Sequence, residues 1–238
     1  MPVMAKFVRK TLRAVFNHDP SFCDMYESEG ARCAAQEYLE PIRRHLHQHF
    51  GDRRLTILDA GCQAGRLLIP LDQEGHQLIG IDTSGFALRR ARQHAKARRL
   101  TVRFARGTIA DVRRWVKPSS VDAVMCTEVL YLCEEYRTIL ERLAETVKPN
   151  GLLCISHRPL WYYVAIAVKR GQPEQALSVL GRAEGPSPDG TYHNWQTPEQ
   201  LQTLYRSLRL RLLQWYPINH LVVEANGLAL HPSVVQAL

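Results

Sequence analysis

Several features that would define a protein class are missing from this sequence. Its six cysteines, at positions 23, 33, 62, 126, 133 and 154, form no Cys-x-x-Cys pair, and no Cys/His cluster has the spacing of a zinc site. The longest strongly apolar run, Leu160–Val168, is too short to span a bilayer, and the N-terminus lacks the apolar core of a secretory signal. These absences argue against a disulfide framework, a metal site and a membrane-spanning protein. They favour reduced, packed thiols in a cytoplasmic protein.

Acidic residues are scarce in one stretch of the chain. Residues 85–117 contain eleven Lys and Arg residues and a single acid, Asp111, whereas the whole chain has 31 basic and 23 acidic residues and a formal net charge of +8. The rest of the chain is therefore slightly acidic. A local basic surface of this kind favours solubility and docking to an acidic partner. Nucleic acid is one alternative partner for it.

Short apolar runs alternate with amphipathic helices along the middle of the chain. The runs cover residues 55–60, 77–82, 101–105, 121–127 and 152–156. Continuous apolar strands separated by helices are typical of a parallel sheet that is covered on both faces. Two further apolar segments, 208–216 and 221–224, add an antiparallel edge pair. The sequence therefore predicts an α/β, doubly wound, Rossmann-like and mostly parallel sheet of seven strands.

The segments on either side of this alternation predict two helical additions. Residues 1–50 predict an N-terminal helical cap, including a basic helix over 5–17 for which contact with a membrane surface is an alternative. Residues 51–238 form the main domain, which is interrupted by a cap insertion at about 157–195. Within the insertion, the sequence predicts one helix over 160–180 and a loop over 181–190.

Polar residues at the ends of the first two strands indicate a ligand site. Gly61 and Gly65 follow the first strand and allow a tight turn, and Asp82 ends the second strand 21 residues after Gly61. An acid at this distance is typical of a group that binds ribose hydroxyls. Asp59 would repel a pyrophosphate but would attract a cationic ligand. The pattern therefore disfavours a nicotinamide dinucleotide, whose fingerprint also has a third glycine.

Five segments carry a resemblance to a known family. They are Ile57–Arg66, Gly80–Ser84, Gly107–Asp111, Val121–Leu132 and Lys148–Ser156, in this order. They resemble the successive motifs of class I S-adenosylmethionine-dependent methyltransferases, and most of all the small-molecule branch that includes ubiquinone and menaquinone biosynthesis enzymes. The resemblance covers about residues 52–157. It implies an enzyme that uses S-adenosyl-L-methionine to methylate a small-molecule acceptor.

The resemblance also implies which residues bind the cofactor. The methionine part is assigned to the turn after the first strand and to the end of the fourth, the ribose to the end of the second, and the adenine to the two loops beside it. The residues concerned are Asp59, Gly61, Cys62, Gln63, Gly65, Asp82, Thr83, Thr108, Ile109, Cys126 and Thr127. Two of them depart from the family pattern, because Gln63 replaces a glycine and Thr108 replaces an aspartate.

Three residues are candidates for catalysis. Glu128 follows the fourth strand at a position that is often acidic in this branch, and Tyr131 lies in the same loop. His157 leaves the fifth strand at the rim of the predicted site, where an imidazole could act as a general base. Two other functions stay open at this stage: an RNA- or protein-modifying methyltransferase that uses the basic 85–117 face, and a non-catalytic cofactor-binding protein.

Overall fold

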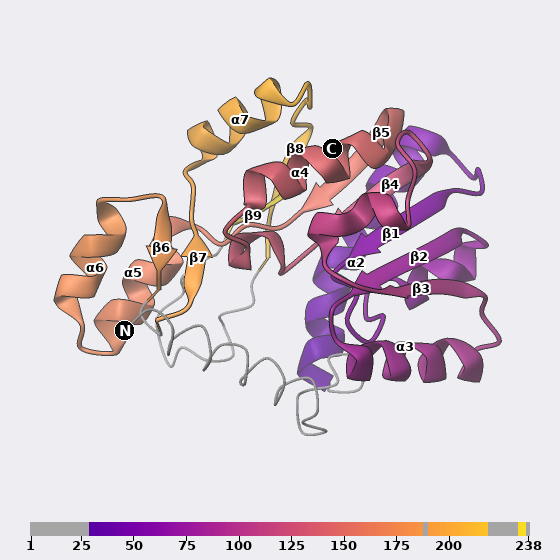
Figure 1. Ribbon diagram of the computed structural model, residues 1–238, viewed down its shortest axis with the longest axis horizontal. Coiled ribbons are helices and arrows are strands. Elements are labelled where there is room, and N and C mark those ends of the chain that lie inside the picture. The colour runs from indigo at the N-terminus through magenta and orange to yellow at the C-terminus, as the bar shows by residue number, and fades with distance from the viewer. Residues whose placement is uncertain (1–28, 188–189, 219–232, 237–238) are drawn as a thin grey trace.

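A five-stranded sheet forms the centre of the protein (Figure 1). The computed structural model describes residues 29–187, 190–218 and 233–236. The strand order is β3-β2-β1-β4-β5, and every neighbouring pair in this sheet is parallel. The strands are β1 (Thr56–Ala60), β2 (Gln77–Asp82), β3 (Val102–Arg106), β4 (Val121–Cys126) and β5 (Val147–Ile155). The predicted parallel α/β architecture is therefore confirmed.

Helices cover both faces of this sheet. The α-helices are α2 (Glu29–Phe50), α3 (Gly85–Ala97), α4 (Tyr136–Thr146), α5 (Leu160–Lys169), α6 (Pro173–Leu180) and α7 (Pro198–Ser207), and the 3₁₀ helices are η1 (Ile69–Glu74), η2 (Ile109–Arg114) and η3 (Leu130–Leu132). Apolar side chains of α2, η1 and α3 pack in one core, whereas those of η2, η3, α4 and α7 pack in the other.

The two-residue period of the strands explains how one sheet serves two cores. In β4, Ala123 and Met125 lie in the core with α2, whereas Val124 and Cys126 lie in the core with α4. All six residues of β4 are buried. A strand buried on both faces needs a nearly continuous apolar run, because successive side chains point to opposite sides. The exception in β4 is Asp122, which is paired with Lys148. The nearly continuous run is why the sequence pattern located the central strands well.

The prediction of a seven-stranded sheet is wrong for the described residues. Strand β8 (Gln214–Pro217) pairs with β9 (Ser233–Gln236) in a separate antiparallel ladder, which lies close to β5 but does not extend the main sheet. Residues 208–213 form no strand. Their apolar side chains pack against the two cores instead, so their hydrophobicity reflects packing and not strand pairing. The strand predicted at 221–224 lies outside the described residues.

The insertion differs from the prediction of one helix followed by a loop. Gly171, with φ at +67°, separates α5 from α6. The predicted loop contains β6 (Glu184–Pro186), which pairs antiparallel with β7 (Tyr192–Asn194). Tyr163, Val179 and Trp195 form a small core of their own. The insertion is thus a separately packed lobe beside the sheet, seen on the left of Figure 1.

Only part of the predicted N-terminal cap is described. Helix α2 continues through Pro41 without a break, and its Leu39, Ile42 and Leu46 are buried in the core of the sheet. The helix predicted over 5–17 lies outside the described residues. Within the described ranges, no helix is both long and apolar enough to cross a membrane.

Three of the cysteines in the part of the chain that the structure describes are packed inside the protein, as predicted. Cys62, Cys126 and Cys154 are buried, Cys33 is exposed, and Cys133 is partly buried. Burial raises the pKa of the Cys126 and Cys154 thiols. Such thiols are protonated and unreactive at neutral pH, in keeping with a packing role.

Candidate active site

The carboxyl ends of β1, β2, β4 and β5 meet at one edge of the sheet. Asp59 of β1 pairs with Gly80 of β2 on one side and with Met125 of β4 on the other. The central strand β1 is therefore flanked by two strands whose connections run in opposite directions along the sheet. This is the point at which an open parallel sheet binds its ligand.

The turn after β1 is held in a shape that requires glycine. Gly61 has φ at +95°, and a Cβ placed on it would lie 2.3 Å from Cγ2 of Val129. Its N–H and that of Cys62 both donate to the carbonyl oxygen of Ile81, at 2.8 and 3.1 Å. The turn is thus fastened to β2, and its backbone lies where a ligand can approach closely.

Gln63 adopts a glycine-like conformation although it is not glycine. Its φ is +46°, and its side-chain oxygen accepts a hydrogen bond from the N–H of Ala64 at 3.4 Å. The backbone N–H of Gln63 donates to Oδ2 of Asp82 at 2.9 Å. Gln63 therefore takes a positive-φ conformation in this turn without being glycine.

Two carboxylates, Asp59 and Asp82, lie beside this turn. Asp59 is only 3% exposed, and its pKa is raised to about 7 by burial and by the charge of Asp82, against the opposing effect of Arg66. Burial also raises the pKa of Asp82, whereas its hydrogen bonds from backbone N–H groups oppose the rise. One of these, from Ser84, measures 2.7 Å. Because two close acids destabilise each other, the pair suits a cationic ligand.

The loops predicted to contact adenine lie next to Asp82. Thr83 and Thr108 are exposed, whereas Ile109 is 6% exposed. The hydroxyl of Thr108 accepts a hydrogen bond from the N–H of Ala110 at 3.3 Å and so caps η2. Thr108 therefore has a local structural function whether or not a ligand is bound.

At the end of β4, the residues predicted to bind the cofactor are buried. Cys126 is fully buried in the core with α4, and Thr127 is 8% exposed. The carbonyl oxygen of Cys126 accepts a hydrogen bond from the N–H of Ser156 at 3.2 Å. This bond fixes the residues that follow β4 against those that follow β5.

Glu128 is the centre of a dense polar cluster. Its φ is +60°, a conformation that L-residues rarely adopt. Its Oε1 accepts from the hydroxyl of Tyr38 at 2.7 Å, and its Oε2 accepts from the hydroxyl of Tyr131 at 2.7 Å and from Nη2 of Arg158 at 2.9 Å. The N–H of Glu128 donates to Oγ of Ser156 at 2.6 Å. We call these five residues the Glu128 cluster.

The cluster keeps Glu128 ionised. Burial by itself would raise its pKa, but the charge of Arg158 and the donated hydrogen bonds outweigh burial and hold the pKa at about 2. A carboxylate with so low a pKa and so many donors is a poor proton acceptor at neutral pH. The geometry thus places the predicted catalytic residues Glu128 and Tyr131 in direct hydrogen-bond contact, and their roles in catalysis stay predictions.

His157 faces the other side of the sheet. It is 4% exposed, and its Nε2 lies 2.7 Å from the hydroxyl of Tyr205 on α7. Burial lowers its pKa to about 3. Its Nδ1 has no hydrogen-bond partner among the described residues. The imidazole is therefore neutral and packed between β5 and α7, apart from the Glu128 cluster.

This environment of His157 leads to a prediction about acid stability. The unfolded chain takes up a proton at His157 below about pH 6.5, whereas the folded chain does so only near its pKa of about 3. The contribution of neutral His157 to the free energy of unfolding is therefore complete above pH 6.5 and is lost as the pH falls toward 3. We expect His157→Gln to lose less stability than the wild type between pH 7.5 and 5.5 in urea unfolding. His47→Gln, at a side chain that is 72% exposed, is the control and should follow the wild type. If His157 instead acts as the base, its replacement would abolish methyl transfer and leave the acid profile unchanged.

Sequence reasoning missed three members of the Glu128 cluster: Tyr38, Ser156 and Arg158. Tyr38 comes from 90 residues upstream, and no local pattern indicates it. A signal for Ser156 and Arg158 did exist. Cys154 of β5 faces the core with α2, so the two-residue period puts Ser156 and Arg158 on the same side and His157 on the opposite one.

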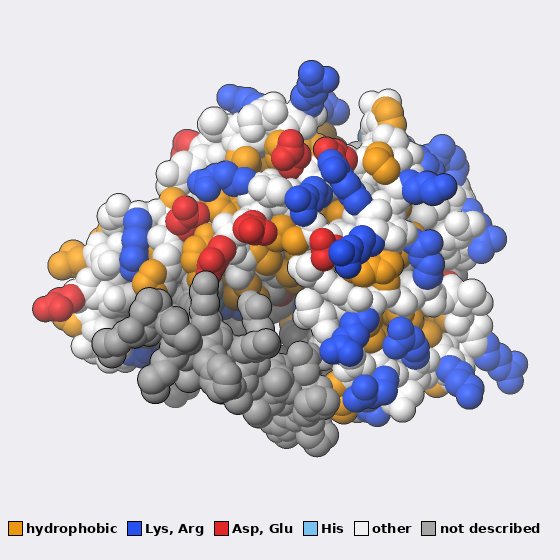
Figure 2. Space-filling model, in the orientation of Figure 1, with side chains coloured by type: hydrophobic (Ala, Val, Ile, Leu, Met, Phe, Trp, Pro, Cys, Tyr) orange, Lys and Arg blue, Asp and Glu red, His pale blue; other side chains and the backbone are white. Residues whose placement is uncertain are grey.

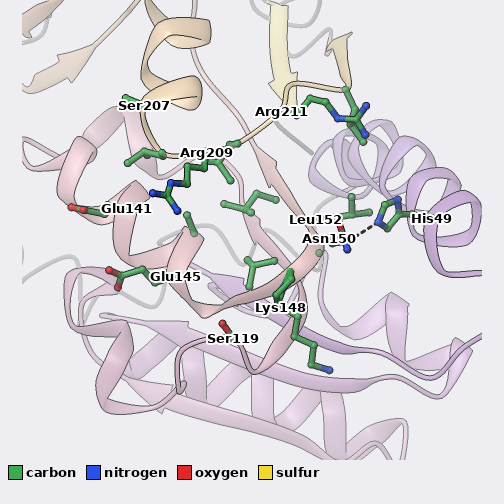
Figure 3. Close-up of a pocket in the computed structure, with 18 residues that line it drawn as sticks. His49, Ser119, Glu141, Glu145, Lys148, Asn150, Leu152, Ser207, Arg209 and Arg211 are labelled. Atoms are coloured by element: carbon green, nitrogen blue, oxygen red, sulfur yellow. Dashed lines mark hydrogen bonds between the residues drawn. The ribbon is translucent and has the colours of Figure 1, made fainter.

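A large open cavity lies at the opposite end of the sheet. It measures about 780 Å³ and contains none of the predicted site residues. Figure 3 shows it between α4, the first half of β5 and residues 207–213, with Glu141, Lys148 and Arg209 among the residues that line it. Nε2 of His49 lies 2.6 Å from the carbonyl oxygen of Asn150 at its far side. Ligands of open parallel sheets bind at the carboxyl ends, so this cavity is not the candidate active site.

Comparison with known proteins shows what this chain resembles. Residues 57–151 match the family model described as a methyltransferase domain. The fold matches that of magnesium protoporphyrin IX methyltransferase from Synechocystis PCC 6803, solved with bound SAH, with a TM-score of 0.69 at 19% identity over 96% of this chain and 97% of the other. A 1,6-didemethyltoxoflavin-N1-methyltransferase from Burkholderia thailandensis gives a TM-score of 0.65 at 18% identity over 100% of this chain and 89% of the other. The fold is that of class I methyltransferases.

Curated relatives make the assignment more specific. A ubiquinone biosynthesis O-methyltransferase from Rickettsia canadensis is 29% identical over 50% of this chain and 49% of its own length. That of Bradyrhizobium diazoefficiens is 32% identical over 62% of this chain and 54% of its own length. The predicted similarity to the ubiquinone branch of class I methyltransferases is confirmed. The chain spans about half the length of the curated relatives it matches.

Proposed function

We propose that this protein is an S-adenosylmethionine-dependent methyltransferase that acts on a small-molecule acceptor. The observation that carries the proposal is the pair of acids, Asp59 and Asp82, beside a glycine turn at the carboxyl edge of the sheet. The pair is poorly compensated by the described residues, and a ligand that brings positive charge relieves it. The matched methyltransferase domain and the related O-methyltransferases support the same conclusion.

The residues near this turn are arranged to hold the donor. Asp59 would face its cationic methionine part, and Asp82 would accept hydrogen bonds from ribose hydroxyls while its oxygens also hold the turn. When bound, S-adenosylmethionine supplies a methyl group on a positively charged sulfur. The remaining residues of this proposed site are Gly61, Cys62, Gln63, Gly65, Thr83, Thr108, Ile109, Cys126 and Thr127.

The position of the insertion favours a small acceptor. Tyr162 of α5 and Tyr38 of α2 both reach the Glu128 cluster, so the strand ends are enclosed by two elements that lie outside the parallel sheet. Basic side chains instead gather over α3 and β3, on the right of Figure 2. The basic 85–117 face is thus remote from the insertion. Neighbours of known substrate act on a didemethyltoxoflavin and on magnesium protoporphyrin.

Calorimetric titration with S-adenosylmethionine tests this function. Because the pKa of Asp59 is raised to about 7, the wild type should bind roughly tenfold more tightly at pH 8 than at pH 6, since each unit below the pKa costs about 1.36 kcal/mol. Asp59→Asn should bind S-adenosylmethionine weakly at both pH values. Its affinity should change with pH only through the ionisation of the ligand's own amino group. Asp52→Asn, at a side chain that is 96% exposed, is the matched control and should behave like the wild type.

Two outcomes would contradict the proposal in different ways. Absence of binding at high micromolar concentration would refute the methyltransferase function. Tight binding with the same pH dependence in wild type and Asp59→Asn would keep the function but remove Asp59 from the donor site.

A further inference from the structure

At the carboxyl edge of the sheet, the described part of the chain offers no side chain well suited to remove a proton from an acceptor. Glu128, with a pKa of about 2, already accepts three side-chain hydrogen bonds within 3 Å. His157 is buried on the opposite side of β5. Asp59 lies beneath the glycine turn, where the proposed function pairs it with a cation. In the described part of this edge, the acceptor must therefore be ionised by other means.

Arg158 is the positively charged member of the Glu128 cluster. It follows β5, and its guanidinium carbon lies 4.5 Å from the ring centre of Tyr131 and 4.7 Å from that of Tyr162. Its Nη1 donates to the hydroxyl of Tyr162 at 2.9 Å. The side chain remains 28% exposed. Arg158 is thus held by two aromatic rings but is still open to solvent.

The hydrogen bonds of Arg158 leave donor capacity for a ligand. A guanidinium carries five N–H groups, and among the described residues Arg158 uses one on Glu128 and one on Tyr162. Glu128 cannot release it easily, because Tyr38 and Tyr131 fix the position of the carboxylate. An arginine that is held in place in this way is preorganised, and it can stabilise a developing anion without rearranging.

We propose that Arg158, together with the rings of Tyr131 and Tyr162, forms a binding site for an acidic hydroxyl group of the acceptor in its ionised form. This inference rests on the proposed methyltransferase function. The acceptor hydroxyl gives its proton to solvent, and the resulting oxyanion is held by the guanidinium. An oxygen lone pair then forms the new O–C bond to the methyl group, while the C–S bond breaks and its electron pair stays on sulfur.

The chemistry of the site defines the class of acceptor. A guanidinium next to two tyrosine rings suits a planar aromatic or enolic hydroxyl, which can stack and can ionise near neutral pH. An aliphatic alcohol is far too weak an acid to be ionised by one neighbouring charge. The acceptor is therefore a phenol or an enol, and Arg158 determines this preference.

Binding of 4-nitrocatechol to the full chain, in the presence of S-adenosylhomocysteine, tests the site without turnover. The ionised form of this probe absorbs at longer wavelength than the neutral form. The wild type should bind it as the anion and lower its apparent pKa by at least one unit. Arg158→Met should remove this spectral shift. Arg137→Met, whose guanidinium lies 4.5 Å from the ring of Tyr136 and whose side chain is 61% exposed, is the control and should keep it.

Rates with two probes of different acidity give a second readout. With unsubstituted catechol, Arg158→Met should lose about 100-fold in kcat/KM at pH 7, and its pH–rate profile should move to higher pH. With 4-nitrocatechol, which is already largely ionised, the loss should stay below about tenfold. The kcat/KM of Arg158→Lys should lie between those of the wild type and Arg158→Met, because lysine keeps the charge but not the forked geometry.

A stability control separates folding from recognition. Arg158→Met leaves Glu128 without its counter-charge, so the double variant Glu128→Gln/Arg158→Met is measured as well, and both must bind S-adenosylhomocysteine. Equal spectral shifts and equal probe dependence in wild type and Arg158→Met would overturn the inference. Failure of the wild type to bind S-adenosylhomocysteine would refute the proposed function itself.

Discussion

Gly61→Ala is expected to lower the free energy of unfolding by about 2–5 kcal/mol. The backbone at Gly61, with φ at +95°, costs an alanine about 1–2 kcal/mol. The added methyl group would also lie 2.3 Å from Cγ2 of Val129, and overpacking of this kind costs a further 1–3 kcal/mol or so. Urea unfolding of the purified protein measures the difference.

Gly51→Ala is the matched control for Gly61→Ala. Gly51 also has positive φ, at +63°, but nothing lies within 4 Å of the added Cβ. The Gly51→Ala variant should lose only about 1 kcal/mol of unfolding free energy, which is the cost of the backbone conformation alone. Adding Val129→Ala to Gly61→Ala should recover part of the loss, because it removes the clashing methyl group. Equal effects of the two single variants would show that the contact with Val129 does not constrain the turn.

Glu128→Gln is expected to destabilise the protein by about 2–4 kcal/mol at pH 7. The substitution leaves the guanidinium of Arg158, 28% exposed, without its carboxylate partner. Breaking a buried ion pair costs about 3–5 kcal/mol, and the partial exposure of this pair lowers that figure. Glu40→Gln is the control, because Glu40 pairs with Arg44 at side chains that are 75% and 50% exposed. Such a surface pair contributes about 0–1 kcal/mol.

The acid dependence of Glu128→Gln provides an independent check. The folded pKa of Glu128 is lowered from 4.5 to about 2, so its contribution is complete above pH 4.5 and is lost as the pH falls toward 2. The difference between wild type and Glu128→Gln should therefore shrink over that range. The double variant Glu128→Gln/Arg158→Met should be more stable than Glu128→Gln alone. A constant difference across the acid range would contradict the assignment of Glu128 as the ionised partner of Arg158.

The donor site was largely accessible from the sequence because it is built from local segments. Asp59, Gly61 and Gly65 lie within seven residues of one another, and Asp82 ends the neighbouring strand. Once two parallel strands are recognised, their carboxyl ends must meet, and so must the residues that follow them. The roles of these residues in binding stay predictions, but their convergence does not depend on distant parts of the chain.

The Glu128 cluster, next to the proposed acceptor site, could not be predicted, because it is formed by contacts between residues that are distant in sequence. Glu128 binds side chains that are 90 residues upstream and 30 residues downstream of it. His157 and Arg158 are neighbours in sequence but face opposite sides of β5. Residue type alone favoured His157 as a catalytic residue, which stays a prediction, whereas burial and pairing are the grounds on which Arg158 is proposed.

The sequence by itself determined the parallel sheet, its two helical layers and the ends of the strands that carry the proposed donor site. Hydrophobic period and glycine spacing encode these features, because they follow from which side chains must be buried and which backbone angles are allowed. Only the tertiary structure decided that the main sheet has five strands in the described residues, that the insertion is a lobe of two helices and a hairpin, and that Arg158 lies at the proposed acceptor site. Those features depend on strand pairing and long-range packing, which set the neighbours of a side chain independently of its position in the sequence.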